Sequence, residues 1–230
     1  MDCSINHSYN WLVVSIIISA HIDRGWLDDA ILSAKNQTFI DKEIILSSDG
    51  NWSLKEYAER HEIGFCCTPK RNHSFAFYHA AQMASGEWIK ECHDDDELLP
   101  NAVTDLYKTR KGAGLVYGNA IEVWPTCDVI YRPPAEITLS SLLPVVTNPI
   151  NFLTIMFRRD AFFSVGGFDF NLVYAEDYDF YLSLLQKGYK FNYCNKEVVR
   201  YRHHDKQLTC EFNYDKRVWT ADYIGKKHNL

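Results

Sequence analysis

The stretch from Gly86 to Pro100 holds the densest group of residues that could do chemistry, with the sequence GEWIKECHDDDELLP. Residues 87–92 have the composition of a short strand, and residues 94–97 are four consecutive acids that precede a proline where a helix could begin. Carboxylates at the carboxyl edge of a sheet are hard oxygen ligands, which a divalent cation carrying a diphosphate requires. A solvated acidic turn that favours the N-terminus of the next helix is an equally simple interpretation.

A second group of acids opens a predicted helix over residues 175–187. Glu176 and Asp179 fall on its polar side, whereas Asp177 falls at the border of the apolar stripe. That stripe consists of Tyr178, Tyr181, Leu182 and Leu185. A carboxylate at the border is partly desolvated, which raises its pKa and suits a general base. The alternative is that all three acids only complement the helix N-terminus.

A histidine pair, His203 and His204, follows the last predicted strand. Histidine is a common metal ligand, but adjacent residues of a strand point to opposite sides, so at most one of the pair faces a given site. An ordinary surface pair is the alternative. The same geometry applies to Asp94 and Asp95, and we therefore favour one direct carboxylate ligand over two.

The bulk properties predict a compact globular protein. The 230 residues are enough for one sizeable core, and 47% of them are hydrophobic. The net charge of -6 does not indicate a nucleic-acid-binding protein. Seven cysteines without CxxC spacing indicate neither a zinc site nor a disulfide framework, so we expect a cytoplasmic protein. The apolar run over residues 11–20 is too short to span a bilayer.

The elements that position the acids alternate between strands and helices in the first half of the chain. The predicted strands cover residues 13–18, 43–47, 64–67 and 87–92, and the predicted helices include residues 27–34, 54–60, 76–84 and 99–107. This alternation predicts an α/β fold with a mostly parallel central sheet flanked by helices and right-handed crossovers. The strand ends at residues 19–21 and 48–50 should then meet the acidic loop on one edge.

The second half is less regular. Predicted strands cover residues 114–123, 151–157, 189–194 and 198–203, and the segment 125–149 is expected to be a long connection. The last 25 residues fit no predicted element. We treat residues 1–230 as one domain, with a ligand-binding half over residues 13–110 and a second half over residues 111–230.

Six blocks, in this order, resemble a family 2 glycosyltransferase of the GT-A fold. They are VSIII, NQTF with EII and SDG, ASGEWI with DDD and LLP, FRRDAFFSVGGFD, AEDYDFYLSLLQKGYKF, and YRHHD. Together they cover residues 13–209, nearly the whole chain. The resemblance implies an inverting transfer of a sugar from a nucleoside diphosphate donor, a UDP-sugar being the first choice, to a hydroxyl of a glycan or glycoconjugate. It also implies a divalent cation, Mn²⁺ or Mg²⁺, and a role in polysaccharide biosynthesis.

The resemblance implies that residues 13–110 are the nucleotide-sugar-binding half and residues 111–230 the acceptor-binding and catalytic half. It also assigns the donor side of the site. It implies that Ser19 and His21 lie along the nucleoside and that Asp49 contacts the base. Asp95 would ligate the metal bound to the diphosphate, and Asp94 would approach the ribose or the metal.

On the acceptor side, Asp177 matches the catalytic base, with Glu176 beside it. His204 matches a histidine of the closing C-terminal segment that touches the diphosphate or the metal.

Several positions depart from the family pattern. His21 stands where a tyrosine is usual, Ser48 and His93 each replace an aspartate, and Phe77 replaces an arginine of the third helix. Lys70 or Arg71 is then the expected substitute for the missing donor-binding cation. These changes bear on the identity of the donor more than on the reaction.

Two other functions are compatible with the same sheet. A nucleotidyltransferase generally needs a glycine-rich basic loop after the first strand, and Ser19-Ala20-His21-Ile22 has neither feature. A non-catalytic nucleotide-sugar-binding module is the other alternative. Peripheral association with a membrane face and a homodimer stay open at this level.

Overall fold

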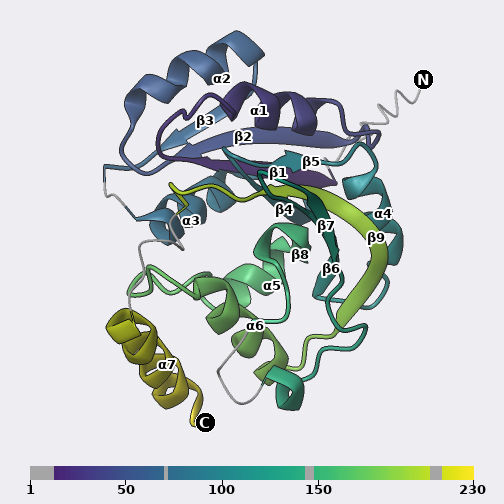
Figure 1. The fold of residues 1–230 in the computed structure, drawn as a ribbon, viewed down its shortest axis with the longest axis vertical. Helices are drawn as coiled ribbons and strands as arrows, with labels where there is room; N and C mark the ends of the chain where they lie inside the picture. The colour runs from purple at the N-terminus through teal and green to yellow at the C-terminus, as the bar shows by residue number, and fades with distance from the viewer. Residues whose placement is uncertain (1–12, 70–71, 143–147, 208–213) are drawn as a thin grey trace, which may run out of the picture.

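The computed structural model describes residues 13–69, 72–142, 148–207 and 214–230. Within these residues nine strands form one sheet, in the order β3-β2-β1-β4-β8-β6-β9-β5, with β7 paired to β6 (Figure 1). Its longest ladders are parallel, whereas β8 runs antiparallel to both β4 and β6. The predicted α/β class with a mixed, mostly parallel sheet is therefore confirmed. Among the described residues, no helix is long and apolar enough to cross a membrane.

The first half folds as the periodicity predicted. The parallel strands are β1 (Val14–Ala20), β2 (Lys42–Ser48), β3 (Gly64–Cys67) and β4 (Trp88–His93). The helices are α1 (Leu27–Lys35), α2 (Lys55–His61), α3 (His73–Met83) and α4 (Ala102–Thr109). Strand β1 is buried along its whole length, as expected for β-branched residues covered on both faces.

The second half differs from its prediction in several places. Its strands are β6 (Leu115–Val123), β7 (Asp128–Tyr131), β8 (Ile155–Arg158) and β9 (Phe191–Arg202). The short strand β5 (Glu97–Leu98), which was not predicted, lies in the first half and pairs with β9. The two strands predicted over residues 189–203 are one continuous strand, β9, because a register shift against β6 absorbs the polar residues between them. The segment expected to be a connection contains β7 and a 3-10 turn, Leu139–Leu142.

The remaining helices are α5 (Arg159–Ser164), α6 (Glu176–Gln186) and α7 (Tyr214–His228). Two further 3-10 turns cover Trp52–Leu54 and Phe152–Thr154, so the strand predicted from residue 151 begins only at Ile155. Helix α7 lies in the segment that had no predicted structure.

The helices cover both faces of the sheet. On one face α1, α2 and α4 pack over the even-numbered residues of β1, such as Ile16 and Ile18. On the other face α3, α5 and α6 pack over Ile17 of β1 and Phe157 of β8. Figure 1 shows α1 and α2 on one side of the sheet and α5 and α6 on the other. This two-sided cover leaves the carboxyl edge of the parallel strands as the place for a ligand.

Helix α7 corrects the prediction for Asp179. That residue was expected on the polar side of α6, yet it is 1% exposed. Its carboxylate lies 2.8 Å from Lys227 Nζ and 2.8 Å from His228 Nε2, both on α7. Two residues of α7 that lie 48 and 49 positions later in the sequence therefore contact this buried acid and compensate its charge.

We expect Asp179→Ala to lower the free energy of unfolding by about 3 kcal/mol, because it leaves His228 and Lys227 without their buried partner. Urea unfolding measures the change. The matched control is Asp222→Ala, which breaks an exposed i,i+4 pair with Lys226 and should cost less than about 0.5 kcal/mol. Equal losses for both variants would contradict the proposed anchoring of α7.

Candidate active site

One cavity of about 560 Å³ lies at the carboxyl ends of β1, β2 and β4. It collects predicted site residues from four parts of the chain. They are Ser19 near the end of β1 and His21 after it, Asp49 after β2, Asp94 and Asp95 after β4, and Glu176 and Asp177 at the start of α6. His204 contacts this group through Asp95. Arg71 and Lys70 lie outside the described residues, so their predicted role stays a prediction.

The first acid of the loop, Asp94, is bound closely to the edge of the sheet. Its backbone N–H donates to the carbonyl of Ser19 at 3.1 Å. Burial, together with the charge of Asp95, raises the pKa of Asp94 to about 6, although Arg24 lies 3.6 Å away. The negative charge of this loop is therefore only partly compensated by the protein.

The second and third acids have different partners. Asp95 Oδ2 lies 2.9 Å from His204 Nε2, and the charges of His93 and His204 outweigh burial and keep its pKa below the usual range. Asp96 is 1% exposed and accepts a hydrogen bond of 2.7 Å from the backbone N–H of Arg202. Asp96 therefore joins the loop to β9, whereas Asp94 and Asp95 face the cavity.

The donor set beside the cavity fits a divalent cation. His93, Asp95 and Asp96 each offer a ligand atom, and these atoms lie within 4.8 Å of one another. Asp94 Oδ2 is buried and accepts no hydrogen bond from any described residue. A cation with oxygen and imidazole ligands would offset this excess of negative charge.

Beside the acidic loop, residues at the ends of the neighbouring strands β1 and β2 line another part of the cavity. His21 Nδ1 lies 2.7 Å from Asp49 Oδ1. Asn51 donates to the carbonyl of His21 at 3.0 Å, and the Ser48 hydroxyl accepts from the Asn51 N–H at 3.2 Å. The serine that replaces an aspartate thus holds the turn that carries Asp49.

A buried charged network connects the two acidic groups. Glu91 of β4 is fully buried, and its Oε1 lies 2.8 Å from His73 Nε2 and 3.3 Å from His93 Nε2. His73 Nδ1 lies 3.5 Å from Glu176 on α6. Burial opposes ionisation of Glu91, but the charge of His73 prevails and lowers the pKa of Glu91 to about 2. Sequence analysis missed this network, since alternation within β4 does not reveal which helix lies beside Glu91.

Asp177 occupies a partly buried position in the first turn of α6. Asn148 donates to its Oδ2 at 2.6 Å, and the backbone N–H of Tyr178 donates to its Oδ1 at 2.8 Å. Burial, with the charges of Glu176 and Glu91, raises the pKa of Asp177 to about 7. The preceding residue, Ala175, has a φ of 61°, a strained conformation of the kind found at functional sites.

Two further cavity residues were not identified from the sequence. Arg24 follows β1 and faces Asp94, so a cation is present on the donor side independently of Lys70 and Arg71. Its position three residues after His21 was a usable signal. Asn148 gave no signal, because it lies in the connection whose path only the tertiary structure determines.

Comparison with known proteins gives one family. The family model "Glycosyl transferase family 2" matches residues 15–162. The chain is similar to a chondroitin synthase of Pasteurella multocida (strain Pm70), at 29% identity over 203 residues that cover 83% of the chain and 20% of that protein. It is also similar to a hyaluronan synthase of Pasteurella multocida, at 29% identity over 196 residues that cover 80% of the chain and 20% of that protein. The chain spans about a fifth of the length of these curated relatives.

The fold also matches solved structures. A crystal structure of S. aureus TarS 1-349 in complex with UDP-GlcNAc is similar over 95% of the chain and 68% of that protein, with a TM-score of 0.72 and 13% identity. The structure of S. aureus TarS 1-349 with UDP is similar over 94% of the chain, with a TM-score of 0.64 and 14% identity. At these sequence identities the similarity to TarS shows a shared fold.

Proposed function

Because the chain belongs to glycosyl transferase family 2 and has the GT-A fold, we propose that this glycosyltransferase moves a sugar from a nucleoside diphosphate to a hydroxyl of a glycan or glycoconjugate, with inversion. A UDP-sugar is the donor that we favour, since the similar TarS structure contains UDP-GlcNAc. Polysaccharide synthesis is the setting suggested by the names of the two Pasteurella relatives.

One observation carries this proposal: Asp95 and Asp177, far apart in sequence, line the same cavity. Its volume of about 560 Å³ is in the range of small-ligand sites. Acids from two separate elements, the loop after β4 and helix α6, allow one group to face the leaving diphosphate while the other faces the attacking hydroxyl. We propose Ser19, His21 and Asp49 as the nucleoside-binding residues on the same edge of the sheet.

The proposed base is Asp177. With a pKa near 7, its carboxylate is a good proton acceptor, and about half of it is ionised at pH 7. Asn148 and the Tyr178 N–H hold the two carboxylate oxygens, which orients the group toward the cavity. Glu176 is held by His73 and would position the acceptor beside this base.

Asp95 would hold the divalent cation, with His204 close enough to share the role. The cation would supply charge neutralisation for the leaving diphosphate. Arg24 adds a positive charge on the same side of the cavity and balances part of the charge of Asp94.

The test is donor hydrolysis and thermal shift across a panel of nucleotide sugars and nucleotides, each with and without Mn²⁺. We expect one nucleoside diphosphate sugar to be hydrolysed slowly, and its nucleoside diphosphate to raise the melting temperature only with metal. A preference for nucleoside triphosphates, or no response to any nucleotide, would refute the proposal.

A further inference from the structure

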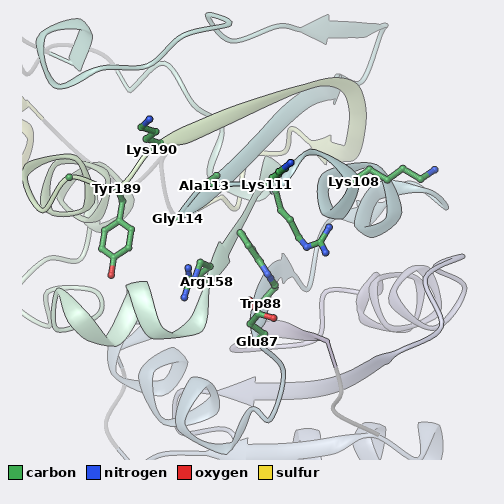
Figure 2. A pocket seen from close by; sticks show the side chains of 12 residues that line it. Glu87, Trp88, Lys108, Lys111, Ala113, Gly114, Arg158, Tyr189 and Lys190 are labelled. Atoms are coloured by element: carbon green, nitrogen blue, oxygen red, sulfur yellow. The ribbon is translucent and has the colours of Figure 1, made fainter.

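A second cavity, of about 590 Å³, lies at the opposite edge of the sheet (Figure 2). Its wall includes Trp88, the first residue of β4, whereas His93 at the end of β4 lines the first cavity. A strand rises about 3.3 Å per residue, so β4 separates the two walls by about 16 Å. The second cavity is therefore distinct from the proposed active site.

The residues lining this cavity are strongly basic. They include Lys108, Arg110, Lys111, Arg158 and Lys190, whereas Glu87 is the one acid among the lining residues. Lys108, Arg110 and Lys111 come from the end of α4 and the following turn, and folding brings Arg158 of β8 and Lys190, the residue before β9, to them. In a chain with a net charge of -6, such a cluster is a local reversal of the overall charge.

Most of these cations keep their charge available. Among the described residues, no carboxylate lies within ion-pair distance of Lys108, Lys111 or Lys190. Arg110 is held in place by stacking on the Tyr107 ring, at 3.4 Å, and by donating to the Tyr107 carbonyl. Arg158 is the exception, because it is paired with Asp160.

A buried donor points to a ligand with oxygen acceptors. Trp88 is 2% exposed, and its indole Nε1 has no hydrogen-bond partner among the described residues. A buried N–H without an acceptor costs free energy that a bound oxygen would recover. Trp88, Arg158 and Tyr189 all line the cavity (Figure 2).

We propose that this cavity binds an anionic saccharide, that is, one or two sugar units carrying a phosphate or a carboxylate. Arg110, Lys111 and Lys190 would bind the anionic group, and Tyr189 offers an aromatic face for the sugar ring. A bilayer surface fits the site less well, because none of the exposed large apolar side chains among the described residues lines it. A charged segment of a growing or acceptor glycan could thus be held away from the reaction centre.

The Trp88 indole provides a direct probe. Its N–H resonance in a ¹⁵N–¹H spectrum is assigned by its disappearance in Trp88→Phe. We expect hexose 6-phosphate and a free hexuronic acid to shift this resonance saturably, and neutral hexose to leave it unchanged. The same shift is expected in Asp95→Ala, which lacks the proposed metal ligand. The result of this experiment is therefore independent of whether the proposed active site binds the donor.

Charge reversal tests the assigned cations. The variant Arg110→Glu/Lys111→Glu/Lys190→Glu should raise the half-saturating concentration of hexose 6-phosphate at least about tenfold. The matched control, Lys55→Glu/Lys216→Glu/Lys226→Glu, changes the same number of charges on helices α2 and α7, whose residues do not line the cavity. It should keep the half-saturating concentration within about twofold.

Four results would overturn the inference. They are the absence of a saturable shift, an equal loss of binding in both triple variants, equal affinity for inorganic phosphate and hexose 6-phosphate, and binding only to phosphatidylglycerol vesicles. The third result would indicate a simple anion site, and the fourth would indicate a membrane contact. Circular dichroism of both triple variants shows whether they are folded. If the variant of the cavity residues is unfolded, the single variant Lys111→Glu replaces it.

Discussion

Asp177→Asn is expected to reduce sugar transfer by about 10²- to 10⁴-fold, the range typical for loss of a general base. The amide has the shape of the carboxylate but accepts no proton at neutral pH. Donor binding should survive, because Asp177 comes from α6 and not from the ends of β1 and β2 that carry the proposed nucleoside-binding residues. Initial rates with saturating donor measure the loss, and nucleotide-induced thermal shift measures binding.

Stability distinguishes a catalytic loss from unfolding. Burial makes the pKa of Asp177 higher in the folded chain than in the unfolded chain, so its ionised form destabilises the fold above pH 4. Asn removes that cost, and the melting temperature at pH 8 should be unchanged or higher. Asp222→Asn, on the exposed face of α7, is the control for loss of an acid and should keep full activity. Full transfer by Asp177→Asn would show that another residue is the base.

The wild-type pH profile follows from the same carboxyl. Transfer should fall tenfold per pH unit on the acid side of about pH 7, as Asp177 becomes protonated, and level off above it. In Asp177→Asn this acid limb should disappear from the residual activity.

Asp95→Ala is expected to abolish the metal-dependent part of donor binding and to reduce transfer by about 10²- to 10³-fold, because a metal ligand that neutralises the diphosphate is lost. Thermal shift by the nucleoside diphosphate, with Mn²⁺ or with EDTA, measures the effect. In the wild type, EDTA should reproduce the binding loss of the variant. In Asp95→Ala, EDTA should add nothing further.

Glu97→Ala is the matched control for Asp95→Ala. It removes an acid from the same run, but this carboxylate is bound to Arg202 and does not line the cavity. It should keep the response to Mn²⁺. Loss of the metal response in both variants would mean that the loop, and not Asp95 itself, determines binding.

The strands and helices of the first half were predictable because their signals are local. The β-branched run that forms β1 reflects burial of both faces of the strand. The apolar spacing at Leu27, Ala30 and Ile31 reflects burial of one face of helix α1. The meeting of the strand ends at residues 19–21 and 48–50 with the acidic loop followed from the same signals, since parallel strands end at one edge.

The second half was less predictable because non-local contacts decide it. A register shift against β6 makes β9 one strand, and β6 also stabilises the exposed strand β7. Helix α7 has weak local signals, and its anchor, Asp179, has the sequence pattern of a surface acid. None of these contacts can be read from a window of neighbouring residues.

The sequence by itself therefore determined the family resemblance, the α/β class and the acids that line the first cavity. Only the tertiary structure decided that Asp94, Asp95 and Asp96 have different partners, that Glu91 and His73 connect the two acidic groups, and that a basic cavity lies at the far edge of the sheet. The physical reason is that the charge and pKa of a side chain depend on its neighbours in space. Those neighbours come from distant segments that the sheet brings together.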